Sequence, residues 1–232
     1  MLSAVRVARA AAVNAYSCLA VCICMACAGC AVHAPALSTI SHRLIVAAVE
    51  QGREERLSVY AAISDQDGIA DISRIVIIHD DTELYWELDS SSWSMKEEGS
   101  RYFIGSNGLS APPSSAMPRG SYRVLVYDLA GERAEGSFRL AAPDSAAYAL
   151  PQLVLAGGDA ISVASPYLIN SALFYDAGGN VTKTAPLKEG RTALDALWEQ
   201  GLWRSGADYL AVYSFDPKSE LGLISWKIRL PD

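Results

Sequence analysis

The most reactive side chains in the sequence are five cysteines, all within residues 18–30. A thiolate can act as a nucleophile, bind a metal or form a disulfide. The last cysteine, Cys30, follows the small residues Ala28 and Gly29, and no cysteine comes after it. If the chain is cleaved after Gly29, Cys30 becomes the N-terminal residue and has no partner for an intramolecular disulfide, so the protein must be stabilised by core packing.

The sequence before Cys30 has the pattern of an export signal. Residues 1–9 contain Arg6 and Arg9 but no acid, and residues 10–28 are uncharged. A basic start followed by an apolar run is typical of a signal peptide, which we predict at residues 1–29. Two alternatives remain open. The run is long enough for a retained transmembrane helix, and residues 26–28 also fit an ordinary signal peptidase site that would leave Cys30 unmodified.

The tetrapeptide Cys27-Ala28-Gly29-Cys30 resembles the lipobox of bacterial lipoproteins, in which the cysteine thiol accepts a diacylglycerol. Cys27 stands where a branched aliphatic residue is usual, and this looser pattern is similar to that of spirochaete lipoproteins. The resemblance implies that Cys30 carries fatty acid chains such as palmitate. Several chains would anchor the protein firmly to a membrane of the cell envelope, on the periplasmic face or the cell surface. Residues 30–42 are then expected to be the lipidated cysteine and a tether.

Residues for acid–base or metal chemistry are scarce in the remaining sequence. Two of the three histidines, His33 and His42, fall in or beside the expected tether, which leaves His79 inside folded sequence. His79 precedes Asp80 and Asp81 and is predicted to be a solvated turn residue. A histidine metal site or a Ser-His or Cys-His pair is therefore not expected. We predict no catalytic residues and no cofactor.

An acidic turn contains Asp65, Asp67 and Asp71 around Gly68. Calcium loops alternate oxygen ligands around a glycine, but placing Gly68 at the invariant glycine would make Ile63 the first ligand and Arg74 the twelfth. A plain Asp-Gly turn is therefore expected, and no metal site is predicted. A weaker calcium site formed by Asp65, Asp67 and Asp71 remains open.

Residues 43–140 read as short strands separated by turn signals, the pattern of an all-β domain. In the strand at residues 83–89, Leu84, Trp86 and Leu88 alternate with acids, so Trp86 is predicted to be a core tryptophan of an immunoglobulin-like or fibronectin-III-like β-sandwich. Residues 105–120 are expected to form a long loop, and its Asn107 is a candidate ligand-binding residue.

Three segments, residues 105–109, 118–124 and 128–133, together resemble a module of uncharacterised spirochaete lipoproteins. The resemblance covers about residues 43–140. It implies a sandwich fold and an envelope location, and it implies no activity.

The strand pattern restarts after a linker at residues 141–148, so residues 149–232 are predicted to be a second, smaller, mainly-β domain. One short helix is expected at residues 192–200, because Leu194, Leu197 and Trp198 recur at helical spacing. Trp198 and Trp203 flank its end. They are predicted to be core residues, but with Trp93 they remain candidates for stacking on a sugar.

Composition narrows the functional classes. The net charge is −7 and becomes −9 without Arg6 and Arg9, so nucleic acid is not an expected partner and membrane attachment has to come from the lipid. The leading hypothesis is a noncatalytic, lipid-anchored envelope protein that binds a protein or a surface polymer. The alternative is a carbohydrate-binding or glycan-processing protein that uses Trp93, Trp198 or Trp203 with nearby carboxylates. A third is a structural spacer.

Overall fold

The computed structural model describes residues 33–50, 52–99, 101–113 and 115–231. The predicted signal peptide, residues 1–29, and Cys30 lie outside the described residues. Ala34–Asp232 forms one compact unit. Within the described ranges, no helix has both the length and the apolar character needed to cross a membrane.

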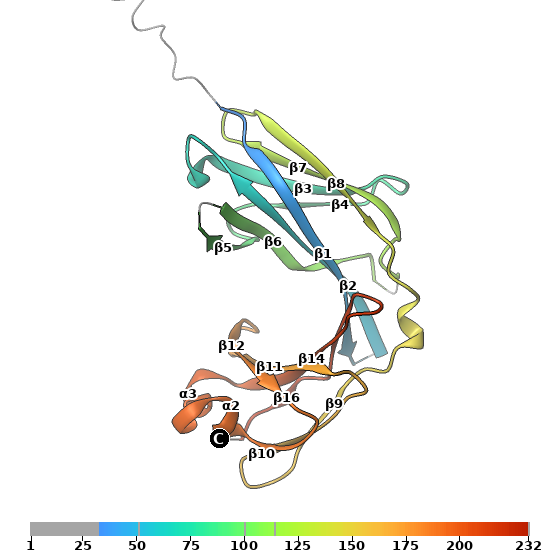
Figure 1. Ribbon diagram of the computed structural model, residues 1–232, viewed down its shortest axis with the longest axis vertical. Helices are drawn as coiled ribbons and strands as arrows, with labels where there is room; N and C mark the ends of the chain where they lie inside the picture. The colour runs from blue at the N-terminus through green and yellow to red at the C-terminus, as the bar shows by residue number, and fades with distance from the viewer. Residues whose placement is uncertain (1–32, 51, 100, 114, 232) are drawn as a thin grey trace, which may run out of the picture. The chain divides into compact units, whose positions relative to one another are not determined.

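The described part of the chain is all-β, with a few single-turn helices (Figure 1). The strands of the N-terminal half are β1 (Ala36–Val49), β2 (Gly52–Ser64), β3 (Ile72–His79), β4 (Tyr85–Leu88), β5 (Ser94–Glu98), β6 (Arg101–Ser110), β7 (Gly120–Asp128) and β8 (Arg133–Leu140). Those of the C-terminal half are β9 (Gln152–Leu155), β10 (Ala160–Ala164), β11 (Ile169–Tyr175), β12 (Val181–Leu187), β13 (Gly190–Ala193), β14 (Tyr209–Asp216), β15 (Leu221–Ile224) and β16 (Ile228–Arg229). The helical turns are η1 (Ile69–Asp71), η2 (Ser145–Ala147), α2 (Leu194–Leu197), η3 (Glu199–Gly201) and α3 (Trp203–Gly206).

The N-terminal half is an immunoglobulin-like sandwich. One layer has the strand order β1-β2-β6-β5 and the other β4-β3-β7-β8, the arrangement of an ABED sheet facing a C′CFG sheet. The fully buried Tyr122 lies near the start of β7, and its hydroxyl donates to the carbonyl of Pro118, 2.6 Å away. This contact is the tyrosine corner expected at that strand of the fold. Leu57, Ile75 and Val124 are among the residues that fill the core between the layers.

The C-terminal half builds a second sandwich around its own core. Strands β12, β11, β14 and β15 form one layer, with β16 paired to β14, and β13-β10-β9 form the other. The core between them includes Ile161, Phe174, Leu194 and Trp203.

Strand β15 joins the two halves into a nine-stranded sheet. It pairs antiparallel with β14 and parallel with β1, where Leu44 is opposite Leu221 and Val46 is opposite Leu223. Leu221 and Leu223 are fully buried in the core of the N-terminal sandwich. The last strands of the chain therefore complete a layer that the first strand begins.

The two faces of this sheet differ, because side chains alternate along a strand. On β1, Leu44 and Val46 are buried, and Leu44 belongs to the N-terminal core, whereas Arg43 points to the other face and is exposed. Leu223 lies opposite Ser214, so the two side chains are on the same face of the sheet, and Val212, two residues before Ser214, is on that face as well. Leu223 belongs to the N-terminal core and Val212 to the C-terminal core. Both cores thus lie on one face, and the opposite face is left open.

The structure confirms the all-β prediction and the alternation in β4, where Trp86 packs against the core and its indole donates to the carbonyl of Ser110, 2.9 Å away. The tether prediction is wrong beyond residue 35, since β1 begins at Ala36. The imidazole of His42 stacks on Phe138 with ring centroids 4.3 Å apart.

Two other predicted elements differ from the structure. The first part of the expected loop at residues 105–120 is strand, because β6 extends to Ser110. The expected helix at residues 192–200 is only α2, since Thr192 belongs to β13 and Trp198 is extended, with φ −144° and ψ 105°.

Candidate ligand-binding groove

A groove of about 1020 Å³ lies on the open face of the nine-stranded sheet. Its walls come from strands of both halves, and on β11 alternate residues, Ser171, Leu173 and Tyr175, contribute. The polar and aromatic side chains that line it include those of Arg43, Glu50, Arg56, Ser58, Asn107, Ser171, Tyr175, Thr184, Tyr213, Trp226 and Lys227. A cavity of this size is typical of ligand-binding sites.

Trp226 is the most exposed tryptophan in the described part of the chain, with 48% of its surface accessible. It lies in a break between β15 and β16. At this break the buried hydroxyl of Ser225 accepts from the amide of Val212, 2.9 Å away, while the amide of Ser225 donates to the carbonyl of Val212. The chain therefore leaves regular pairing and presents Trp226 to the groove.

Two cations line the groove without a carboxylate partner among the described residues. The Arg43 guanidinium donates to the Tyr213 hydroxyl, 3.0 Å away, and lies 4.2 Å from the centre of the Phe215 ring. The Lys227 ammonium lies 3.7 Å from the centre of the Tyr175 ring. Both are cation–π contacts, which hold the charges in place without neutralising them.

Lys227 lies where a positive charge is disfavoured. Desolvation lowers its pKa, and the nearby charge of Arg56 lowers it further, while Asp176 opposes these effects. Arg56 itself forms an ion pair with Glu54, 2.8 Å away. An anion bound beside Lys227 would relieve this repulsion.

One wall of the groove is a polar β-bulge. The pairing of β2 with β6 shifts between Leu57 and Val59, so that Asn107 and Gly108 lie opposite Ser58. The Ser58 hydroxyl donates to Asn107 Oδ1, 2.7 Å away, and Asn107 Nδ2 donates to the Tyr60 hydroxyl, 3.0 Å away. The bulge therefore fixes an amide and a hydroxyl at the edge of the groove.

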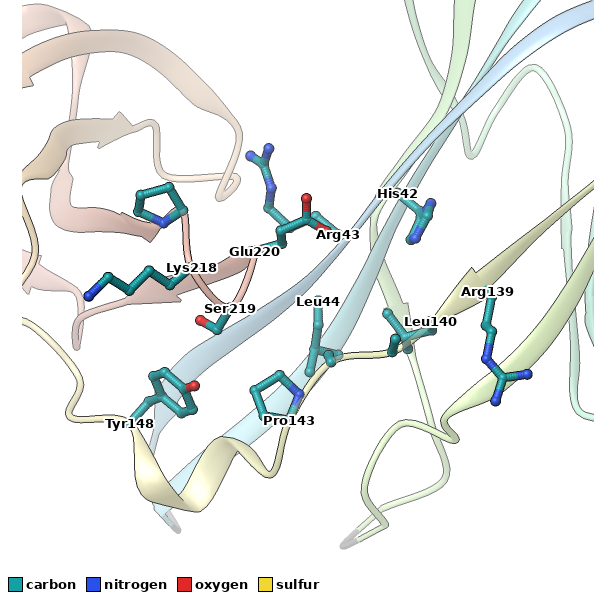
Figure 2. A pocket seen from close by; sticks show the side chains of 13 residues that line it. His42, Arg43, Leu44, Arg139, Leu140, Pro143, Tyr148, Lys218, Ser219 and Glu220 are labelled. Atoms are coloured by element: carbon teal, nitrogen blue, oxygen red, sulfur yellow. The ribbon is translucent and has the colours of Figure 1, made fainter.

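A second cavity, of about 470 Å³, lies between β1, the segment after β8 and the turn between β14 and β15 (Figure 2). It is lined by His42, Arg43, Arg139, Lys218 and Glu220, among others. Figure 2 shows the charged ends of Lys218 and Arg139 pointing away from each other. These cations do not converge on one point, so this cavity is a weaker candidate than the groove.

The structure confirms that Trp203 is a core residue and that Trp198 packs against the core, and it places Trp93, the other candidate for stacking, against the N-terminal core. Trp203 is fully buried and its indole donates to Asp195 Oδ1, 2.7 Å away. Trp198 is half-buried, with its ring centre 5.3 Å from that of Phe174, and Trp93 is half-buried against the N-terminal core. Of the four candidates from the sequence, Asn107 lines the groove.

The expectation that His79 is solvated is wrong. Its side chain is 2% exposed, and its ring nitrogens lie 2.8 Å from the hydroxyl of Thr82 and 3.0 Å from the carbonyl of Arg119. The ring also contacts Tyr122, with centroids 4.8 Å apart. Through these two contacts, the His79 ring connects the turn after β3, which contains Thr82, with the segment before β7, which contains Arg119.

Sequence reasoning missed Trp226, Lys227, Tyr175 and Tyr213. The local sequence gives no sign of the break at Ser225 between β15 and β16. Ser171 and Leu173 are half-buried and alternate with the buried Ala172 and Phe174, a signal that one face of β11 is more open than the other. Which residues share that face across several strands depends on pairing between distant segments.

The comparisons with known proteins leave the function open. No protein-family model matches the chain, and no curated protein matches it. Among solved structures, the chain is similar to dimeric latent PorU from Porphyromonas gingivalis, with 14% identity and a TM-score of 0.35. The match covers 85% of this chain and 20% of that chain. At this level the similarity carries no argument about function.

Proposed function

We propose that this protein is a lipid-anchored, noncatalytic protein of the cell envelope that binds an acidic polysaccharide in the groove on the nine-stranded sheet. The observation that carries the ligand class is the exposed Trp226 beside two cations, Lys227 and Arg43, that have no carboxylate partner in the described chain. A sugar ring stacks on an aromatic face, and its carboxylates pair with cations.

The polar residues of the groove suit the same ligand. Hydroxyls and amides at Ser58, Asn107, Ser171 and Thr184 offer donors and acceptors for sugar hydroxyls. The chain as a whole carries a net charge of −7, so cations gathered in the groove would direct an acidic polymer there rather than elsewhere on the surface.

Binding is better supported than glycan processing. Hydrolysis of a glycosidic bond commonly requires two carboxylates on either side of the bond. Among the described residues lining the groove, Glu50 is the sole carboxylate, and Glu54 nearby is held by Arg56 and by the hydroxyl of Ser110. The groove therefore supports retention of a polymer without cleavage.

The groove is tested with the full-length chain in mild detergent, by titration with polygalacturonate, with dextran as a neutral polymer and polyglutamate as an acidic polypeptide. We expect binding of polygalacturonate that weakens as salt rises, because the ion pairs are exposed. Trp226→Ala and Lys227→Ala should each weaken it at least about 10-fold. Tyr85→Ala, which removes an aromatic exposed on the other sheet, should leave it unchanged.

Three outcomes overturn the assignment of the ligand. Equal affinity for dextran would show that charge is not recognised. Binding of polyglutamate alone would identify an acidic protein as the partner. No binding of any of the three polymers would favour the structural spacer.

The anchor is tested by growing cells that express the full chain with labelled palmitate. Cys30→Ser should abolish the label and release the protein into the soluble fraction, since the thiol is the acceptor in the proposed reaction. Cys27→Leu, which restores the usual lipobox residue, should keep the label. If Cys30→Ser is still labelled, the proposed anchor is misplaced.

A further inference from the structure

The acidic turn after β2 forms the plain turn that the sequence predicts. The amide of Asp67 donates to Asp65 Oδ1, 2.8 Å away, which is the bond of an Asx-turn. One carboxylate oxygen from each of Asp65, Asp67 and Asp71 lies within 4.8 Å of the others. A cluster of acids alone does not identify a metal site, so the weaker calcium site stays a prediction.

A tyrosine ring lies across β15 on the open face of the nine-stranded sheet. Gly222 is buried within β15, opposite Ile45 of β1 and Phe215 of β14. Its φ is not in the left-handed range that favours glycine. The ring of Tyr213 fills the space above it, because a Cβ atom on Gly222 would lie 2.7 Å from Cε2 and 2.9 Å from the hydroxyl oxygen of that ring. Glycine at this position therefore lets the ring lie close to the backbone of the sheet.

The position of this ring determines what its hydroxyl contacts. The Tyr213 hydroxyl accepts from Arg43 Nη1, 3.0 Å away, and the same guanidinium lies 4.2 Å from the centre of the Phe215 ring. Within the described part of the chain this is the one hydrogen bond that the Arg43 side chain donates. The other N–H donors of its planar fork remain available for a carboxylate, and the fork is held in place before any ligand binds.

Arg43 and Trp226 are far apart along the strands. Ala47 of β1 lies opposite Ile224 of β15, and the two strands run parallel. Arg43 is four residues before Ala47, and Trp226 is two residues after Ile224. At about 3.3 Å per residue, the two backbone positions are up to roughly 20 Å apart along the sheet. A single sugar ring is shorter, so a ligand that contacts both side chains has to extend over more than one unit.

Resting on the proposed function, we propose that the groove binds its acidic polymer lengthwise, along β1 and β15. One sugar unit stacks on Trp226 with its carboxylate at Lys227, and the carboxylate of another unit pairs with Arg43. Gly222 is a positioning residue, which acts on Arg43 through the ring of Tyr213. The ligand class is thereby narrowed to extended oligomers that carry carboxylates on several units.

The lengthwise arrangement is tested with galacturonate oligomers of increasing length, titrated against the full-length chain in mild detergent. In the wild type, affinity should rise at least about 10-fold from the dimer to the first oligomer that reaches both contacts, and then level off. Arg43→Ala and Gly222→Ala should remove most of this rise and leave the affinity for the dimer within about 2-fold. Affinity that does not depend on length, or an equal loss for short and long oligomers, overturns the arrangement.

Further variants isolate the route from Gly222 to Arg43. Tyr213→Phe keeps the ring and removes the hydroxyl, so it should act like Gly222→Ala without a steric conflict. Gly222→Ala combined with Arg43→Ala should bind no more weakly than Arg43→Ala alone. The matched control is Gly206→Ala, whose Cβ atom would lie 2.5 Å from the ring of Trp198, since neither residue lines the groove. It should not change binding, and a loss equal to that of Gly222→Ala would overturn the positioning role.

A measurement without any polymer separates this inference from the proposed function. NMR of the free protein should show hindered rotation of the Arg43 guanidinium, identified by its absence in Arg43→Ala, and free rotation in Gly222→Ala and Tyr213→Phe. Free rotation in the wild type, or hindered rotation in Gly222→Ala, overturns the positioning role whatever polymer binds. The expected rotation together with no binding of any oligomer overturns the proposed ligand and the lengthwise arrangement, but not the role of Gly222.

Discussion

The two faces of the nine-stranded sheet share the same strands but have opposite properties. One face packs on two apolar cores, whereas the other forms a groove lined by aromatic rings, hydroxyls and cations together with aliphatic side chains such as Ile45 and Leu173. The contrast is clearest on β2, where Glu55 is 8% exposed on the core face and its neighbour Arg56 lines the groove. Adjacent residues of one strand can thus serve stability and binding separately.

Each face also contains an ion pair. On the core face, the Arg119 guanidinium binds Glu55 through both terminal nitrogens, at 2.7 and 2.9 Å, and donates to the carbonyls of Ala142 and Pro143. On the groove face, Arg56 pairs with Glu54, and both side chains are about one third exposed or more, at 40% and 35%. If the comparison is right, changes on the core face reduce stability and matched changes on the groove face do not.

Trp203→Ala should have the largest effect on stability. Trp203 is fully buried in the C-terminal core, and truncation would leave a cavity and remove its bond to Asp195. We expect a loss of about 3–5 kcal/mol in the free energy of unfolding, measured by urea denaturation. A loss below about 1 kcal/mol would mean that the C-terminal core does not depend on this side chain.

Arg119→Met should cost less, roughly 2–3 kcal/mol. It leaves the buried Glu55 carboxylate with only backbone and hydroxyl donors, but Arg119 itself is 29% exposed. The matched change on the groove face is Arg56→Met, which should cost under about 1 kcal/mol because its ion pair is exposed. Equal losses for the two variants, compared by urea denaturation, would contradict the comparison.

The pH dependence should distinguish the two ion pairs further. Desolvation raises the pKa of Glu55, but hydrogen bonds from Arg119, Ser145 and the Met117 amide outweigh it and lower the pKa overall. Because its pKa is lower in the folded state, Glu55 contributes stability above its unfolded pKa of about 4.3 and loses it as pH falls through the folded value.

Wild-type stability should therefore fall more steeply below about pH 4.5 than that of Glu55→Gln. Urea denaturation from pH 7 down to pH 3 measures both profiles. Parallel profiles would show that Glu55 is not held in its charged form.

Trp226→Ala should have the smallest effect on stability, within about 0.5–1 kcal/mol, since half of the side chain already faces solvent. The same variant should lose polymer binding. A stability loss close to that of Trp203→Ala would place Trp226 in a core rather than in a binding surface.

The fold could be predicted from local patterns. Alternation in β4 and the Asp-Gly turns indicate strands, and the structure confirms an all-β chain with an immunoglobulin-like first sandwich. The prediction of a helix over residues 192–200 was wrong in its length. The spacing of Leu194, Leu197 and Trp198 is also compatible with short helical turns that place these side chains in or against a core. Tertiary packing, rather than helix propensity, decides that segment.

The groove could not be predicted in the same way. Trp203 and Trp226 are both tryptophans near the ends of short elements, and one is fully buried while the other is 48% exposed. Trp203 lies in the C-terminal core, whereas Trp226 follows β15, which pairs with β1 from a distant part of the sequence.

The parallel pairing of β1 with β15 has a consequence for the order of folding. Leu44 pairs with Leu221, which is synthesised long after it, so the N-terminal sandwich cannot complete its sheet until β15 has been made. Until then β1 presents an unpaired edge, the kind of surface that recruits strands from other molecules. Contacts of such long sequence separation form slowly. A chain cut short before β15 should therefore aggregate, although every residue of its first sandwich up to β8 is present.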